Sequence, residues 1–186
     1  MSKAIPDIAV LTGSLRKDSY NKKLAGAVER LAGDRARFNH VRIDDLPLYN
    51  QDYDSDYPAV YKRLKSDIES ADAVLFVSPE TNRSVPGVLK NAIDAASRPW
   101  GTNSFAGKPA AVLGISIGTI GTALMQQHLR NSAVFLDLHM LAQPEVFLQW
   151  SDGLIDDAGQ VSNESTREFL AGFVDKYLAW INRFIA

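Results

Sequence analysis

Residues 8–21 read IAVLTGSLRKDSYN, in which an apolar run ends at Gly13 and a polar loop leads into a helical pattern. A continuous apolar run of this length is typical of a strand that is buried on both faces of a sheet. Apolar side chains then recur at helical spacing through residues 19–33, and Gly33 ends the helix. A buried strand followed by a loop and an amphipathic helix begins a parallel crossover, so this stretch favours an α/β fold.

The same alternation of apolar strands and amphipathic helices continues along the chain. We expect further strands at residues 37–43, 73–77 and 110–115, short ones near Met140 and Val146, and helices at 60–68, 85–93, 119–133 and 163–185. Parallel crossovers are right-handed, which leaves few possible topologies. The order predicts a flavodoxin-like three-layer sandwich, a five-stranded parallel sheet with helices on both faces, forming a single domain over residues 1–186.

Composition and charge exclude several classes of protein. The chain has 186 residues, no cysteine and a net charge of −2. A near-neutral charge argues against a nucleic-acid binder, and a chain without cysteine has no disulfide, thiol redox centre or cysteine-ligated zinc. The three histidines are scattered, so we expect no metal site. The first apolar run is too short for a signal peptide and no run approaches the ~20 residues of a membrane span, so we expect a cytoplasmic protein without membrane contact.

Ligands of such folds bind beyond the carboxyl ends of the strands. Three polar or glycine-rich loops leave those ends, at residues 13–21, 78–86 and 116–122. These loops are therefore the candidate binding site.

The first loop suits a phosphate monoester. It precedes a helix, whose free N–H groups and dipole attract an anion. Its side chains offer hydrogen-bond donors and one positive charge, from Ser14, Ser19, Asn21 and Arg16. The alternative is purely structural: Gly13 turns the chain, Ser19 caps the helix and Arg16 is solvated.

The second loop could recognise the edge of a planar heterocycle. Pro79 and Pro86 stiffen its ends, and Asn82 tolerates a left-handed backbone. A rigid loop of this kind presents backbone amides and carbonyls to a ligand. The alternative is a turn that opens the next helix, with Ser84 as its cap.

The third loop has two interpretations. Its glycines let a ligand approach the backbone, but residues 114–118 also match the G-x-S-x-G nucleophile elbow of α/β-hydrolases. A serine hydrolase would use Ser116 as nucleophile with His128 or His139 as base. Few residues follow Gly118, so the triad spacing is awkward, yet the hydrolase stays an alternative.

Taken together, the three loops resemble those of the NADPH-dependent FMN reductases. Residues 13–21 are similar to the family's G-S-x-R-x-x-S-x-N phosphate loop, and residues 79–87 to its P-E-Y-N-x-S-x-P-G loop. Residues 89–94 match the L-K-N-A-I-D that follows, and residues 116–121 fit the third flavin loop. The resemblance extends from about residue 7 to residue 148.

The resemblance implies an activity, a cofactor and an assembly. Residues 127–130 and Pro144–Glu145 resemble the branch of bacterial quinone and chromate reductases. That branch implies noncovalently bound FMN, NADPH or NADH as electron donor, and a ping-pong reaction with quinones, chromate or similar acceptors. It also implies a homodimer or homotetramer. The flavin would carry the chemistry, so no side chain is expected to be an obligatory catalytic residue.

Site residues follow from the resemblance position by position. The FMN phosphate would be held by Arg16, Ser19, Tyr20 and Asn21, with Ser14 nearby. The isoalloxazine would be bordered by Pro79, Glu80, Thr81 and Asn82, with Arg83 in the same cofactor loop, and the cradle completed by Ser116, Ile117 and Gly118. Arg98 matches an arginine near the substrate entrance of relatives, where it would attract anionic substrates; its alternative is a solvated helix end.

The chain departs from the family pattern at three positions. Thr81 stands where tyrosine is usual, Thr122 replaces a second glycine, and Gln127 stands where relatives can carry a tyrosine in a subunit contact. Two other functions stay open beside the reductase. One is a flavodoxin-like electron carrier without NAD(P)H activity, and the other is the hydrolase based on Ser116.

Overall fold

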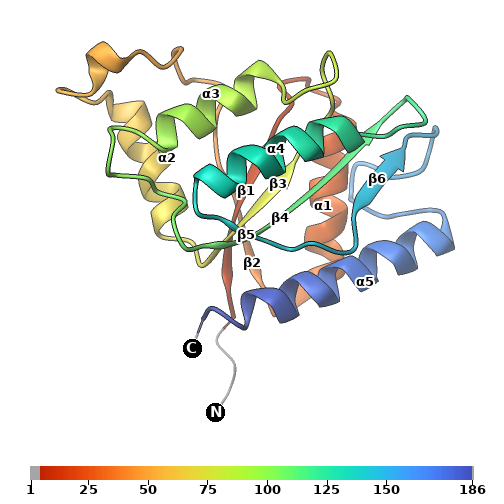
Figure 1. Ribbon diagram of the computed structural model, residues 1–186. Helices are drawn as coiled ribbons and strands as arrows, with labels where there is room; N and C mark the ends of the chain where they lie inside the picture. Colours follow the sequence, from red (N-terminus) through yellow and green to blue (C-terminus); the bar gives the residue numbers. More distant parts are fainter. Residues whose placement is uncertain (1–4, 186) are drawn as a thin grey trace.

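The structure is a computed structural model that describes residues 5–185 (Figure 1). Residues 1–4 and 186, which the predicted domain includes, lie outside the described residues. The strands are β1 (Asp7–Thr12), β2 (Arg37–His40), β3 (Ala73–Val77), β4 (Pro109–Ser116), β5 (His139–Met140) and β6 (Val146–Gln149). The helices are α1 (Tyr20–Ala32), α2 (Ala59–Glu69), α3 (Gly87–Ala96), α4 (Ala123–Phe135) and α5 (Glu164–Ile181), with short 3₁₀ turns at Gly33–Arg35 and Gln51–Tyr53.

All strand pairs are parallel, in the order β2-β1-β3-β4-β5, with β6 also paired to β4. β5 pairs with Pro109 and Ala110 at the start of β4, whereas β6 pairs with Leu113–Ser116 at its end. The described residues therefore contain six strands in five positions. The prediction of a five-stranded flavodoxin-like sheet is confirmed, with its last position divided between two short strands.

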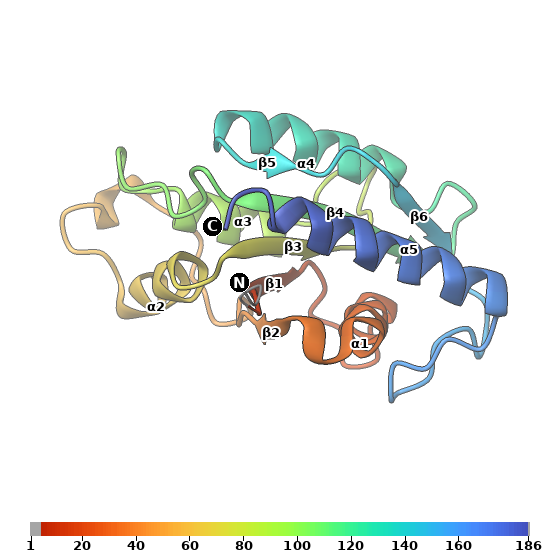
Figure 2. The ribbon, with the colours of Figure 1, turned by 90° about the horizontal axis from the view of Figure 1, so that it is seen from below.

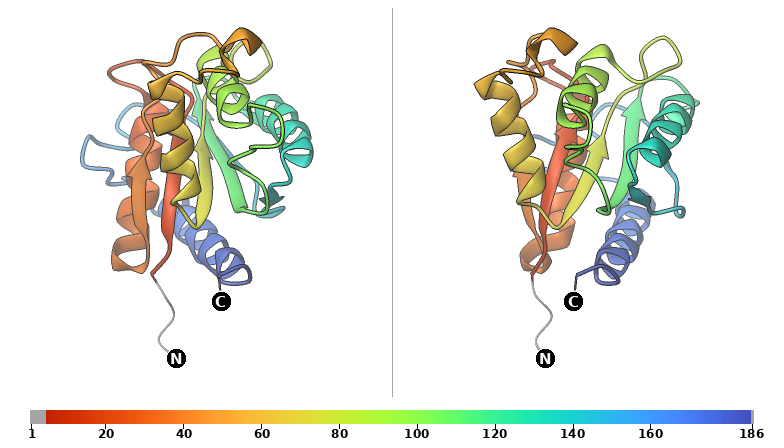
Figure 3. Two further views of the ribbon diagram at one scale, coloured as in Figure 1. Left: turned by 90° about the vertical axis from the view of Figure 1, so that its left-hand side faces the viewer. Right: turned by 60° about the vertical axis from the view of Figure 1, so that its left-hand side comes forward.

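Helices cover both faces of the sheet, because each central strand is apolar on both sides. In β1, Ile8 and Val10 pack with α1 and α5, whereas Ala9 and Leu11 pack with α2, α3 and α4. Figures 2 and 3 show the sheet between these two groups of helices. The three-layer arrangement expected from the sequence is confirmed.

Two ends of α1 follow local sequence signals. The Ser19 hydroxyl accepts a 3.4 Å hydrogen bond from the Lys22 N–H, and Gly33 ends the helix with φ +55°.

The expected start of α4 at residue 119 is wrong by four residues, because the chain first turns at Gly118–Gly121. There the N–H of Gly121 donates to the Gly118 carbonyl and Gly121 has φ +65°.

Within residues 5–185, no helix combines the length and apolar character needed to cross a membrane.

Candidate active site

The three candidate loops lie together at the carboxyl edge of β1, β3 and β4, which are neighbours in the sheet. The N–H of Gly13 donates to the Val77 carbonyl at 3.0 Å, and the N–H of Ser78 donates to the Leu113 carbonyl at 3.1 Å. The order of the strands reverses between β1 and β3, which is where open α/β sheets bind ligands. The prediction that topology brings these loops to one edge is confirmed.

Glycines allow these loops to approach one another. A Cβ atom on Gly13 would lie 2.2 Å from Ser78 Oγ, and one on Gly114 would lie 2.2 Å from the Ser78 carbonyl oxygen and 2.3 Å from Thr122 Oγ1. Gly118 differs, because a Cβ there would meet nothing closer than 3.7 Å. Gly114 thus makes room for Ser78 and Thr122 of the protein itself, whereas Gly118 in the same loop leaves its backbone open to a ligand.

The first loop fits a phosphate. Ser19 caps α1, so the loop ends at the positive pole of a 13-residue helix. The guanidinium of Arg16 lies 5.3 Å from the centre of the Tyr20 ring, and within residues 5–185 no carboxylate lies within ion-pair distance of Arg16. Ser14 lines an adjoining cavity of about 500 Å³. An unneutralised guanidinium, hydroxyls and a helix N-terminus form the donor set that an FMN phosphate requires.

Asn21 has a second use that sequence reasoning missed. Its side-chain Nδ2 donates to the Ile115 carbonyl at 2.9 Å, and its Oδ1 accepts from the Ile115 N–H at 3.1 Å. The amide is buried between α1 and β4, and Asn21 and Ile115 are 94 positions apart in the sequence. Asn21 therefore ties the first loop to the third, and its contact with phosphate stays a prediction.

The second loop is a tight two-residue turn. Thr81 and Ser84 exchange backbone hydrogen bonds, and Asn82 and Arg83 both have positive φ, 51° and 65°. The left-handed conformation expected at Asn82 is confirmed. Ser84 does not cap α3: its hydroxyl is 2.9 Å from His128 Nδ1, and the N-cap position is occupied by Pro86.

Glu80 is largely buried and caps another helix. Its Oε2 accepts 3.1 Å hydrogen bonds from the N–H groups of Leu124 and Met125, at the start of α4. Its Oε1 lies 3.5 Å from a guanidinium nitrogen of Arg83. The carboxylate thus fastens the second loop to the helix behind the third loop. The sequence offers one signal for this capping contact: the first turn of α4 has no acidic residue of its own, so a carboxylate from another segment can interact with its N-terminus.

The third loop excludes the hydrolase alternative. Ser116 Oγ donates to the Gly121 carbonyl at 2.7 Å and accepts from the Gly118 N–H at 3.2 Å. Of the two candidate bases, His128 pairs with the hydroxyl of Ser84, and His139 stacks on Phe184 at the other end of β4. Ser116 therefore has no base and shapes the loop. Ile117, beside it, is 73% exposed at the mouth of the site.

The place of Arg98 near the substrate entrance stays a prediction. It follows the carboxyl end of α3, whose ten residues span ~15 Å at ~1.5 Å per residue. Its guanidinium lies 5.6 Å from the Trp100 ring centre.

Trp150, a residue that sequence reasoning missed, follows the end of β6 and joins the site. The Trp150 indole stacks on Tyr20 with ring centres 4.0 Å apart, and the Trp150 N–H donates to the Ser116 carbonyl at 2.7 Å. No local pattern marks this tryptophan, since its importance depends on the pairing of β6 with β4.

Comparison with known proteins identifies the family. The sequence profile of the NADPH-dependent FMN reductases matches residues 6–152. The chain belongs to this family. This FMN reductase homologue is 51% identical over 174 residues to the 2-hydroxy-1,4-benzoquinone reductase of a Burkholderia species, covering 94% of this chain and 95% of that one. It is 47% identical over 175 residues to a quinone reductase of Pseudomonas putida, covering 94% of each chain.

Solved structures agree with this assignment. FerB, a flavoenzyme NAD(P)H:acceptor oxidoreductase from Paracoccus denitrificans, superposes with a TM-score of 0.93 at 47% identity, covering 97% of this chain and 99% of FerB. A flavodoxin from Pseudomonas aeruginosa reaches 0.57 at 17% identity over 94% and 98% of the two chains, a likeness of fold alone. This FMN reductase homologue is therefore an oxidoreductase that uses FMN and NAD(P)H, as its loops implied.

Proposed function

We propose that the protein passes electrons from NAD(P)H, through FMN bound at the three loops, to quinones in two alternating half-reactions. The observation that carries the proposal is the unneutralised Arg16 guanidinium beside the N-terminus of a 13-residue helix, at the edge where the other two loops converge. The quinone reductases at 51% and 47% identity support quinones as acceptors. Chromate is a second acceptor in this proposal, because it draws on the same bound flavin.

When bound, FMN supplies the redox chemistry by accepting a hydride and returning its electrons to an acceptor. The protein binds and orients it. Phosphate contacts come from the first loop, by Ser14, Arg16, Ser19, Tyr20 and Asn21. The ring system is bordered by the other two loops, by Pro79, Glu80, Thr81, Asn82, Arg83, Ser116, Ile117 and Gly118. Glu80 and Asn21 act mainly by holding these loops together.

We also infer that the protein acts as a homodimer or homotetramer of single-domain subunits in the cytoplasm, where NAD(P)H is available. Trp100, Val134 and Phe135 are 76%, 81% and 66% exposed, and the rings of Trp100 and Phe135 lie 6.2 Å apart. So much exposed apolar surface supports contact with a second copy. Sedimentation should give a single oligomer that Phe135→Glu dissociates; a monomeric wild-type protein would contradict this part of the proposal.

The cofactor and the activity are tested together on purified protein. We expect a yellow protein that releases FMN on heating, loses its colour when NADPH is added without oxygen, and regains it when benzoquinone follows. Loss of colour only with a chemical reductant, and not with NADPH or NADH, would favour an electron carrier. A protein that neither contains FMN nor binds added FMN would overturn the proposed function.

A further inference from the structure

Two aromatic rings and two cations form a cluster beside the phosphate loop. The rings of Tyr20 and Trp150 are 4.0 Å apart between centres and only 15° from parallel. The guanidinium of Arg16 lies 5.3 Å from the Tyr20 ring centre, and the ammonium of Lys23 lies 5.8 Å from the Trp150 ring centre. Stacked aromatic pairs and cation–π contacts both restrict where side chains rest. Tyr20 thus contacts both Trp150 and the cation of the phosphate loop.

The backbone of the same tryptophan holds the third loop. Trp150 donates its N–H to the Ser116 carbonyl at 2.7 Å, and the preceding Gln149 donates its side-chain amide to the Ile117 carbonyl at 3.1 Å. One residue therefore contacts the first loop by its ring and the third loop by its main chain.

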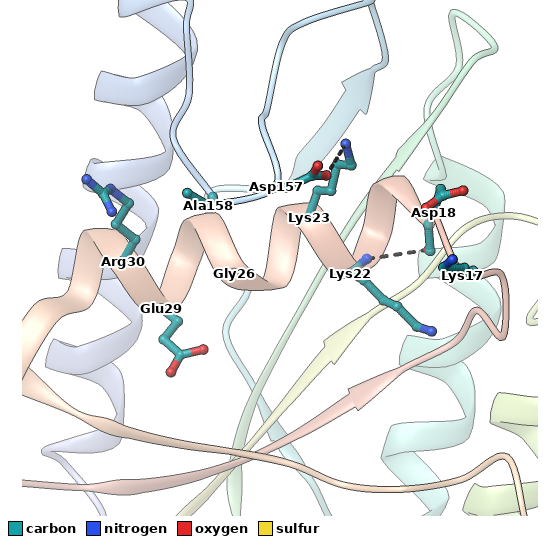
Figure 4. Close-up of a pocket in the computed structure, with 11 residues that line it drawn as sticks. Lys17, Asp18, Lys22, Lys23, Gly26, Glu29, Arg30, Asp157 and Ala158 are labelled. Atoms are coloured by element: carbon teal, nitrogen blue, oxygen red, sulfur yellow. Dashed lines mark hydrogen bonds and ion pairs between the residues drawn. The ribbon is translucent and has the colours of Figure 1, made fainter.

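The segment after Trp150 is fastened to α1 (Figure 2). Ile155 pairs with Val161 across a turn, and both are buried in the core beneath α1 and α5. Gly159 lies so close to Gly26 that a Cβ atom on it would be 2.8 Å from the Gly26 backbone. Figure 4 shows Lys23 reaching from α1 to Asp157, at 2.8 Å. Trp150 is thus anchored on both sides, by β6 before it and by this segment after it.

We propose that Trp150 is a positioning residue for phosphate: its indole fixes the Tyr20 ring, and through that ring the guanidinium of Arg16. The proposal rests on the proposed binding of FMN at these loops. It gives Trp150 no contact with the flavin ring. Removal of the indole should therefore weaken recognition of the phosphate and leave recognition of the ring system intact.

The test compares FMN with riboflavin, which lacks the phosphate, on flavin-free protein by quenching of flavin fluorescence. For Trp150→Ala we expect FMN affinity to fall about 5- to 10-fold, as for the loss of an aromatic pair, with riboflavin affinity unchanged. Trp150→Phe keeps a ring for Tyr20 and should retain most of the FMN preference. Phe169→Ala, which removes an exposed aromatic ring from α5, is the matched control and should change neither affinity.

Each other outcome has a defined meaning. Equal losses for FMN and riboflavin would show a merely structural role and overturn the proposal, as would no loss for either ligand. Loss of the FMN preference in Arg16→Ala but not in Trp150→Ala would overturn this inference alone. A wild-type protein that binds no FMN would overturn the proposed function as well. If Trp150→Ala fails to fold, Trp150→Leu replaces it, and a retained FMN preference in that variant counts against the proposal.

Discussion

The carboxylate of Glu80 accepts a 3.1 Å hydrogen bond from the backbone N–H of Leu124, across a separation of 44 residues. A second N–H of the same helix, from Met125, reaches the same oxygen. The N-cap position of α4 holds Thr122, whose side chain makes no capping hydrogen bond. The second loop thus supplies the cap that α4 lacks, and this contact holds the second and third loops at a defined separation.

Replacement of Glu80 by alanine should cost about 1 kcal/mol of unfolding free energy, the usual effect of a lost helix cap with its favourable charge. Glu80→Gln keeps an acceptor oxygen and should cost less. Urea denaturation measures both. Arg83→Ala removes only a 3.5 Å exposed contact and should change stability by under about 0.5 kcal/mol. Equal stabilities of Glu80→Ala and wild type would contradict the capping role.

Asn21→Ala should destabilise the fold strongly. The substitution leaves the buried N–H and carbonyl of Ile115 without their partners, at a cost of about 1–3 kcal/mol for each unsatisfied group. Chemical denaturation measures the loss, and Asn131→Ala, on the exposed face of α4, is the control with an expected change within about 0.5 kcal/mol. A small effect at Asn21 would show that water replaces the amide.

Arg16→Ala should weaken FMN binding by about 1.5–3 kcal/mol, because a charge-assisted hydrogen bond to phosphate is lost. Riboflavin binding should be unaffected. Lys17→Ala removes a neighbouring positive charge from the same loop and should have a smaller effect. Titration of flavin fluorescence gives the affinities, and an unchanged FMN affinity in Arg16→Ala would count against a phosphate site at this loop.

Gly159→Ala should separate the 156–159 turn from α1. Two effects add at this position: a positive φ of 73°, and a Cβ atom 2.8 Å from the Gly26 backbone. Gly153→Ala has a similar φ of 76° but no atom within 4 Å, so it measures the conformational effect alone, about 1 kcal/mol. Thermal denaturation should show a clearly lower Tm for Gly159→Ala than for Gly153→Ala. Equal values would mean that the turn moves freely.

The interaction of Asp7 with Arg37 should make the stability of the fold depend on pH in the acid range. Its two carboxylate oxygens accept hydrogen bonds from Arg37 at 2.6 and 2.7 Å, which lower the pKa of Asp7 below its usual 3.8. A lowered pKa in the folded state means that the stabilisation is fully present above pH 3.8 and is lost as the pH falls through the lowered pKa. Asp7→Asn should therefore reduce Tm at pH 7 and match wild type in strong acid. A difference that persists in strong acid would contradict the linkage.

Local pattern decided most of the fold. The apolar run before Gly13 and the buried strand at residues 73–77 could only be covered on both faces, so a parallel sheet with two helical layers followed. The helix caps at Ser19 and Gly33 could also be predicted from the sequence, since they depend on neighbours within four residues. The start of α4 could not be predicted, because a turn that ends at Gly121 precedes the helix.

The candidate site likewise has features that the sequence predicted and features that only the tertiary structure showed. The residue types of its three loops, and their resemblance to flavin loops, were present in the sequence by itself. What only the tertiary structure decided is how those loops are held: Asn21 on Ile115, Glu80 on α4 and Trp150 between Tyr20 and Ser116. Each of these contacts joins residues more than 30 positions apart, and local periodicity carries no information about such partners. The residue types of the three loops are thus set by local sequence, whereas the order of the strands determines which distant residues hold the loops in position.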